Sequence, residues 1–133
     1  MYAELHCLTH YSFLRGASAP EELVGRAANS GYHALAITDE CSLAGVVKAH
    51  VAAKERGLKL IVGSEFTLTE GIRLVALVPS REAYGELSGL ISRARRRSGK
   101  GEYRVHLRDV IFHLKRCLLI LLPDDTDNQT VHL

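Results

Sequence analysis

Apolar runs that end in polar clusters divide the first half of the chain into alternating strands and helices. Residues 2–8, 34–37 and 58–62 predict short strands, and the last two are continuous apolar runs of the kind that is covered on both faces. Helices are predicted between them, one from an N-cap at Ser18 to a stop at Gly31. The second spans 43–56, with an apolar side made of Ala44, Val47, Val51 and Ala52. This alternation predicts a parallel sheet with right-handed crossovers.

The middle of the chain predicts a hairpin and a long helix. Apolar segments at 66–68 and 72–78 flank Thr69-Glu70-Gly71, a plausible turn sequence. The segment 81–97 is expected to be helical, with Ser80 as its N-cap. The sheet would therefore continue beyond the parallel strands.

The end of the chain gives a weaker pattern. Residues 105–116 predict a further helix, and the strongly apolar run 117–122 predicts another core strand. The last residues, 123–133, have little apolar content and are expected to form a disordered tail. We therefore expect one α/β domain over residues 1–122.

Composition narrows the class of protein. With 133 residues, 47% hydrophobic and 24% charged, the chain fits one small globular domain, and its net charge of +2 does not by itself imply nucleic-acid binding. No run approaches the roughly 20 apolar residues of a membrane span, and the N-terminus lacks signal-peptide features, so a cytoplasmic protein is expected. Cys7, Cys41 and Cys117 form no C-x-x-C pair and are expected to be buried thiols.

Three polar residues that follow the predicted parallel strands are candidate metal ligands. His6, Asp39 and Glu65 lie in the clusters ELHCLTHYSFLRG, ALAITDECSLAG and LIVGSEF. Parallel strands bring their carboxyl ends to one edge of a sheet, and imidazole with carboxylates suits zinc, manganese or iron. His10 and Glu40 lie in the same clusters and are substitute ligands. Each residue also has a structural alternative, which for Asp39 is capping of the following helix.

A candidate nucleic-acid contact is the basic run of Arg93, Arg95, Arg96, Arg97, Lys100 and Arg104. The alternative is a solvated helix end whose cations complement the helix dipole. The second interpretation is favoured, because Tyr103 is the only aromatic residue interleaved with these cations.

The motifs ELHCLTHYSFLRGAS, PEELVGRAANSGYHALAITDECSLAGVVKAH and GLKLIVGSEF, followed by IRLVALVPSREAYGELSGLISRARRR, resemble the PHP (polymerase and histidinol phosphatase) domain. The resemblance is to the PHP domain at the N-terminus of bacterial C-family DNA polymerase III alpha subunits, closest to their error-prone branch. It implies a distorted β/α barrel with metal ions at the carboxyl ends of its strands. A whole barrel needs about 250 residues, so the first half of one is expected here.

Compared with the family pattern, the metal site looks degenerate. The second His of the first motif is Leu8, an acidic residue is replaced by Arg15, the His after Asp39 is Glu40, and Arg73 stands where a further His is often found. The resemblance implies Mn²⁺ or Zn²⁺ in active members. Guanidinium groups in place of ligands oppose cation binding, so a trinuclear centre is not expected.

The resemblance implies that the parent protein is an error-prone DNA polymerase, a nucleotidyltransferase of DNA replication and damage-tolerant translesion synthesis. Its implied partners are DNA, the other polymerase domains, damage-response proteins and the sliding clamp. This segment lacks the polymerase domains and is expected to be a structural module that is inactive alone. The enzymatic alternative is a small metal-dependent phosphoesterase or 3′–5′ exonuclease, and a third is a nucleic-acid-binding module.

Overall fold

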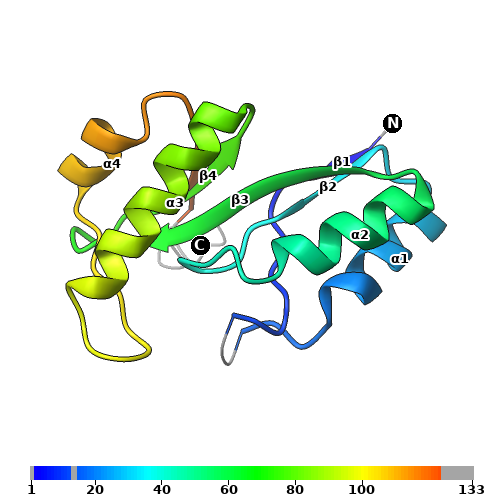
Figure 1. Cartoon of the computed structure of the whole chain (residues 1–133), viewed down its shortest axis with the longest axis horizontal. Helices are drawn as coiled ribbons and strands as arrows, with labels where there is room; N and C mark the ends of the chain where they lie inside the picture. The colour runs from blue at the N-terminus through cyan, green and yellow to red at the C-terminus, as the bar shows by residue number, and fades with distance from the viewer. Residues whose placement is uncertain (1, 13–14, 124–133) are drawn as a thin grey trace, which may run out of the picture.

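The computed structural model of the chain describes residues 2–12 and 15–123 (Figure 1). Five strands form one sheet in the order β1-β2-β3-β4-β5. The strands are β1 (Ala3–Glu4), β2 (Ala34–Ile37), β3 (Lys59–Thr67), β4 (Arg73–Val78) and β5 (Leu118–Leu122). The helices are α1 (Pro20–Asn29), α2 (Val46–Arg56), α3 (Arg81–Arg96) and α4 (Leu107–His113).

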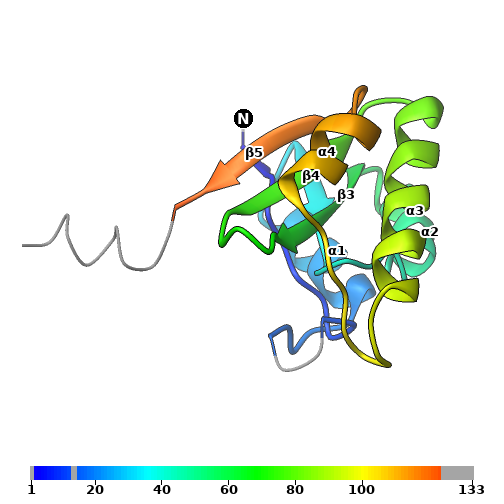
Figure 2. The same ribbon diagram turned by 90° about the vertical axis from the view of Figure 1, so that its left-hand side faces the viewer.

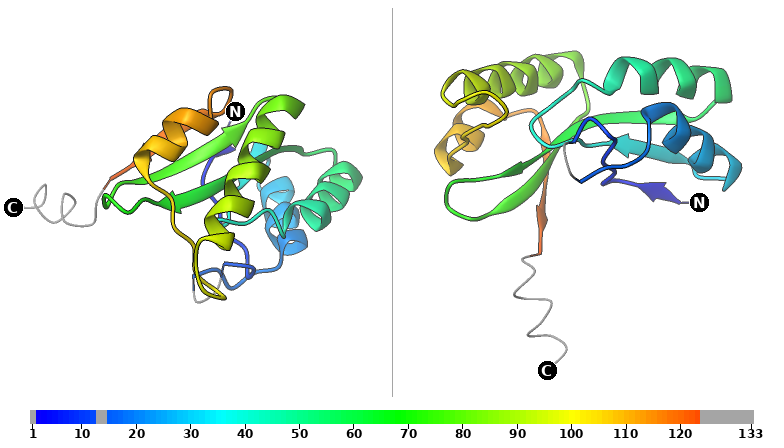
Figure 3. Two further views of the ribbon diagram at one scale, coloured as in Figure 1. Left: turned by 60° about the vertical axis from the view of Figure 1, so that its left-hand side comes forward. Right: turned by 90° about the horizontal axis from the view of Figure 1, so that it is seen from below.

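The sheet is parallel in its first half and antiparallel in its second. β1, β2 and β3 run parallel, whereas β3, β4 and β5 alternate in direction. The predicted hairpin is confirmed, with Thr67 opposite Arg73 and Gly71 at a φ of 88° in the turn. The sheet curls as the first half of a barrel, and the helices follow its outer side (Figure 3).

β3 is longer than the sequence pattern predicted. The segments 58–62 and 66–68 were expected to be separate strands, but residues 59–67 form one strand. Gly63 lies in the middle of this strand, and a Cβ there would lie 2.5 Å from the carbonyl oxygen of Ala76 on β4. Glycine therefore lets β3 and β4 pair closely at this position. The close approach expected at Gly63 is thus observed, and the strand passes through it without a break.

Two cores lie between the helices and the sheet. One is formed by α1, α2 and β2 and includes Val24, Leu35, Ile37 and Ala49. The other lies under α3 and α4 and includes Phe66, Leu74, Leu87, Leu90 and Val110. A smaller cluster, Ala36, Val75 and Leu77 with Ile120 and Leu122, fills the inner face of the curl.

The predicted apolar side of α2 is wrong. Val47 and Val51 are 72% and 52% exposed, while Ala49 and Ala53 are buried. Small side chains on the inner side let α2 pack closely against α1, and the helix begins only at Val46. Because this helix carries apolar residues on both sides, periodicity alone could not select the buried one.

The predicted N-cap of α1 is also wrong. Ala19 is the cap residue, and its backbone N–H donates to Glu22 Oε1 at 3.3 Å. Ser18 lies one residue earlier, and its hydroxyl accepts a hydrogen bond from Arg26. In α3, by contrast, the expected cap is confirmed, since Ser80 Oγ accepts from the backbone N–H of Ala83 at 3.2 Å.

The last strand is not a core strand as predicted. β5 lies at the end of the strand order, and within residues 2–12 and 15–123 it pairs with β4 alone. Leu118, Leu119 and Leu121 are exposed. Figure 2 shows β5 at the margin of the sheet. An apolar run identifies a strand, but it does not say how many neighbours that strand has.

Other boundaries differ by a few residues. β1 has two residues instead of the predicted 2–8, and α4 ends at His113 instead of residue 116. The predicted disordered tail lies outside the described residues, apart from Pro123. Across the described part of the chain, no helix is long and apolar enough to span a membrane.

Candidate functional site

Glu65 is the centre of the candidate site. Its side chain is fully buried, and His6 Nε2 lies 2.7 Å from its Oε1. Both terminal nitrogens of the Arg15 guanidinium donate to the same carboxylate. Nη1 donates to Oε2, and Nη2 donates to Oε1 at 3.2 Å. Arg73 Nη2 donates to Oε1 at 3.3 Å. One buried carboxylate is thus held by an imidazole and two guanidinium groups.

Strand alternation explains why these groups meet. Glu65 of β3 pairs with Val75 of β4, whose side chain belongs to the cluster on the inner face of the curl. Arg73 is two residues before Val75 and therefore points to the same face. His6 and Arg15 both lie in the loop between β1 and α1. The predicted convergence of His6 with Glu65 is observed, as is the placement of guanidinium groups at this centre.

The electrostatics of the cluster favour an ionised Glu65. Burial alone raises the pKa of its carboxyl, but hydrogen bonds from His6 and Arg15 outweigh burial and lower the pKa to about 2. The pKa of Arg15 is raised in turn, chiefly by its hydrogen bond to Glu65. The group is therefore an ion-pair network with its charges already compensated.

Asp39 is buried beside this network, but its carboxylate faces a different loop. Oδ1 accepts from the backbone N–H of Thr9 and the hydroxyl of Ser12, both at 2.6 Å, and Oδ2 accepts from the Thr9 hydroxyl at 2.8 Å. The expected alternative role as a helix cap is wrong, since Gly45 is the N-cap of α2. Asp39 instead fixes the conformation of the loop that follows β1.

Of the two substitute ligands, Glu40 adjoins the centre. Its Oε1 accepts from Arg15 at 2.9 Å, and its Oε2 accepts from the Tyr103 hydroxyl at 2.6 Å. The same hydroxyl accepts from the backbone N–H of Thr67. Burial and the bond to Glu40 raise the pKa of Tyr103. His10 instead packs against Tyr11, with ring centroids 4.7 Å apart and the ring planes tilted by 41°.

Sequence reasoning missed three residues of the site, Thr9, Ser12 and Tyr103. Thr9 and Ser12 lie within the first motif, but only histidine and acidic residues were considered there as candidate ligands. Tyr103 had a signal, since it is the only aromatic residue in a basic loop, but nothing in the sequence linked it to Glu40.

The basic run does not act as one unit. Arg95 points inward and donates to the backbone carbonyls of Cys41 and Glu102. Arg97 donates to Asp109 at 2.6 Å, and Arg93 lies 3.1 Å from His113 Nε2. Arg96 is exposed. Whether these residues contact nucleic acid stays a prediction.

The residues present do not fit a bound divalent cation. Within the described ranges, no group of three or more His, Cys, Asp or Glu side chains lies close enough together to hold a metal ion. The acceptors nearest to such a position, Glu65 and Glu40, are already paired with Arg15. A cation would have to enter beside two guanidinium groups, which repel it.

The sequence profile described as the PHP domain matches residues 4–124. The chain belongs to the PHP domain family. Error-prone DNA polymerases contain similar PHP segments: that of Saccharophagus degradans is 64% identical over 122 residues, and that of Methylococcus capsulatus is 54% identical over 132. These matches cover 92% and 98% of this chain but 12% and 13% of the polymerases. The chain thus spans about an eighth of the length of these relatives.

Solved structures confirm the predicted PHP-like fold. An amidohydrolase from Chromobacterium violaceum, described with bound sulfate and no metal, aligns with a TM-score of 0.60 and 28% identity over 72% of this chain and 34% of its own. A protein from Bifidobacterium adolescentis described as a metal-dependent phosphoesterase aligns with a TM-score of 0.59 and 29% identity over 86% and 44%. The PHP segment therefore corresponds to part of a larger barrel in each.

Proposed function

We propose that this chain is the N-terminal PHP module of an error-prone DNA polymerase and that it serves as a structural element. The parent would add nucleotides to DNA during replication and damage-tolerant synthesis. The 64% identity to the corresponding part of the Saccharophagus degradans polymerase supports this assignment. In the parent, the module would work in the cytoplasm beside the other polymerase domains, with damage-response proteins and the sliding clamp as partners.

The single observation that carries the structural role is the pairing of Glu65 with Arg15 and Arg73. In this proposal His6, Asp39 and Glu65, with Glu40 beside them, are the remnants of a metal-binding motif, and His10 is not part of it. A bound metal ion would connect several strands through its ligands. In this chain Arg15 and Arg73 make that connection instead, because their charge-assisted hydrogen bonds to Glu65 link β3 to β4 and to the loop after β1.

Metal content tests the proposal. Purified chain would be equilibrated with Mn²⁺ or Zn²⁺, freed of excess metal and analysed for bound ions, together with Glu65→Gln. We expect no stoichiometric metal and no difference between the two proteins. The same samples would be assayed for release of nucleotides from a DNA 3′ end, with none expected.

A metal-dependent phosphoesterase is the second candidate. It is favoured by the 2.7 Å contact of His6 with Glu65, which shows that two motifs still converge, and by the similarity to the Bifidobacterium adolescentis protein. Stoichiometric Mn²⁺ or Zn²⁺ that disappears in Glu65→Gln, with hydrolysis lost in His6→Ala, would support this candidate and overturn the structural role.

A further inference from the structure

The charge of the molecule is divided unevenly between its two ends. Residues 91–116 contain nine of the 17 Lys and Arg residues and two of the 15 acidic ones, so this segment carries +7 and the rest of the chain −5. In Figure 1 this segment comprises the end of α3, the loop after it and α4, on the side of the molecule opposite α1 and α2. The small net charge of the whole chain conceals this division.

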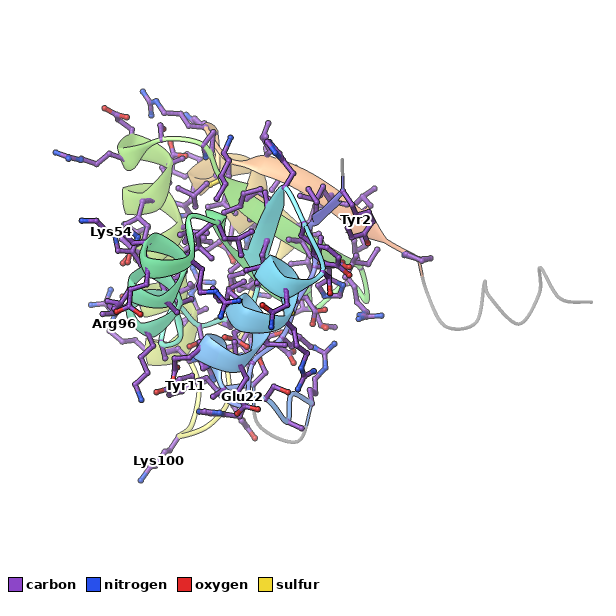
Figure 4. The ribbon with its side chains drawn as sticks, turned by 90° about the vertical axis from the view of Figure 1, so that its right-hand side faces the viewer. Tyr2, Tyr11, Glu22, Lys54, Arg96 and Lys100 are labelled. Atoms are coloured by element: carbon purple, nitrogen blue, oxygen red, sulfur yellow. The ribbon has the colours of Figure 1, made fainter. Side chains whose placement is uncertain are left out.

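The structure separates the cations of this segment by what they contact. Arg95 and Arg97 have internal partners, as described above. The other seven are exposed. Arg116 is paired with Glu86, and Lys115 lies over the ring of Phe112. The remaining five form what we call the basic corner: Arg93, Arg96, Lys100, Arg104 and Arg108. Figure 4 shows Lys100 extending from its loop into solvent. The one exposed acid in the same segment is Glu102, because Asp109 is paired with Arg97.

The members of the basic corner come from adjoining elements. Arg93 and Arg96 are three residues apart on α3 and therefore neighbours on its surface. The backbone N–H of Arg104 donates to the carbonyl of Ala94, which places the returning loop against α3. Arg93 contacts His113 across the two helices, so α4, which carries Arg108, packs alongside. These contacts bring the segments that carry the five cations together at one end of the molecule.

Helix-dipole complementarity does not account for the whole corner. It applies to Arg93 and Arg96 in the last turn of α3. Arg108, however, lies in the first turn of α4, where a cation is disfavoured by the dipole, and Lys100 and Arg104 lie in the loop. A cluster of five exposed cations against one exposed acid is the usual footprint of a phosphate-binding surface.

We propose that the basic corner binds the phosphodiester backbone of DNA. The choice of DNA over another polyanion rests on the proposed function, whereas the phosphate chemistry rests on the surface itself. Binding would be independent of base sequence, because the exposed groups are cations that suit phosphate contacts. The corner is separate from the Glu65 cluster, so loss of DNA binding would leave the metal test unaffected.

Fluorescence anisotropy with a labelled oligonucleotide, as single strand and as duplex, would test the proposal over a series of NaCl concentrations. We expect binding at low salt. The logarithm of the association constant should fall linearly with the logarithm of the salt concentration, with a slope of roughly 0.7 per phosphate contact for single strands and 0.9 for duplex. The variant Arg96→Gln/Lys100→Gln/Arg108→Gln should lower the steepness of this slope by about 2 to 3 and weaken binding at least tenfold.

The matched control removes the same charge elsewhere. Arg26→Gln/Lys54→Gln/Lys59→Gln changes three exposed cations at the α1–α2 end and should retain the wild-type slope. Thermal unfolding followed by circular dichroism would establish that both variants are folded. Absence of binding at low salt, or equal losses in the two triple variants, would overturn the proposal.

Discussion

Arg15 and Glu65, fifty residues apart in sequence, form a two-nitrogen contact in which the carboxylate is fully buried and the guanidinium only partly so. Arg73 and His6 add further contacts to the same carboxylate. Such a carboxylate depends on its partners, because an unpaired buried charge is much less stable than a paired one. The consequences for stability can be measured.

Replacement of Arg15 by Leu should destabilise the chain by about 2–4 kcal/mol, since Glu65 would keep only Arg73 and His6. Urea unfolding would measure the change in free energy. Arg26→Leu is the control, because Arg26 is exposed and pairs weakly with Glu22, so its unfolding midpoint should barely move. An Arg15→Leu midpoint equal to that of the control would contradict the role of the network.

Stability should fall in acid because Glu65 must be protonated. Its pKa is about 2 in the folded chain and about 4.3 when unfolded, so its contribution is complete above roughly pH 4.5 and is lost as the pH falls toward 2. The contribution is on the order of 3 kcal/mol. Asp109, whose pKa the hydrogen bond from Arg97 lowers to about 2, acts in the same direction.

Denaturant unfolding at a series of pH values would measure this dependence. Glu65→Gln should flatten the profile between about pH 4.5 and 2, leaving the smaller slope due to Asp109 and other carboxylates. A profile as steep as that of the wild type would show that another group is responsible.

Gly63→Ala should destabilise the sheet by about 1–3 kcal/mol, because its Cβ would press on the backbone of Ala76. Gly89 provides the comparison. It lies on an exposed part of α3 with open space around the position of a Cβ, so Gly89→Ala should stabilise by up to about 1 kcal/mol. If both substitutions shifted the thermal midpoint in the same direction, the close approach at Gly63 would not be limiting.

Self-association should occur through β5. Its sequence, LLILL, reads the same in both directions, so two antiparallel copies would place Leu or Ile opposite one another at every position. Light scattering should show mass increasing with concentration, and Leu119→Lys/Leu121→Lys should suppress the increase. Val47→Lys/Val51→Lys, which changes two exposed apolar residues on α2, should not. A wild-type chain that stays monomeric would refute the prediction.

The sequence predicted the site better at the level of motifs than at the level of side-chain directions. The resemblance located His6 and Glu65 and identified Arg15 and Arg73 as cations in place of ligands, and all four meet in the structure. The order of the motifs along the chain predicts this meeting, because consecutive parallel strands lie side by side and the loops that follow them become neighbours. The inward direction of Arg95 depends on packing between elements far apart in sequence, which a linear pattern does not contain.

The same distinction applies to the fold. The strand–helix alternation and the hairpin were predicted from local signals such as Ser80 and Gly71, which act within a few residues. The exposure of Val47 depends on which side of α2 meets α1, and that choice is made by tertiary packing.

The three hydrogen bonds that Asp39 accepts from Thr9 and Ser12 constrain how this chain could change. A histidine introduced at position 8 or 73 would add a nitrogen donor, but the carboxylate of Asp39 would still accept its three hydrogen bonds from the loop. Recruiting it would require several coordinated substitutions, and the intermediates would leave a buried charge unsatisfied. The hydroxyls of the first motif thus place a metal-binding Asp39 several substitutions away from the present sequence.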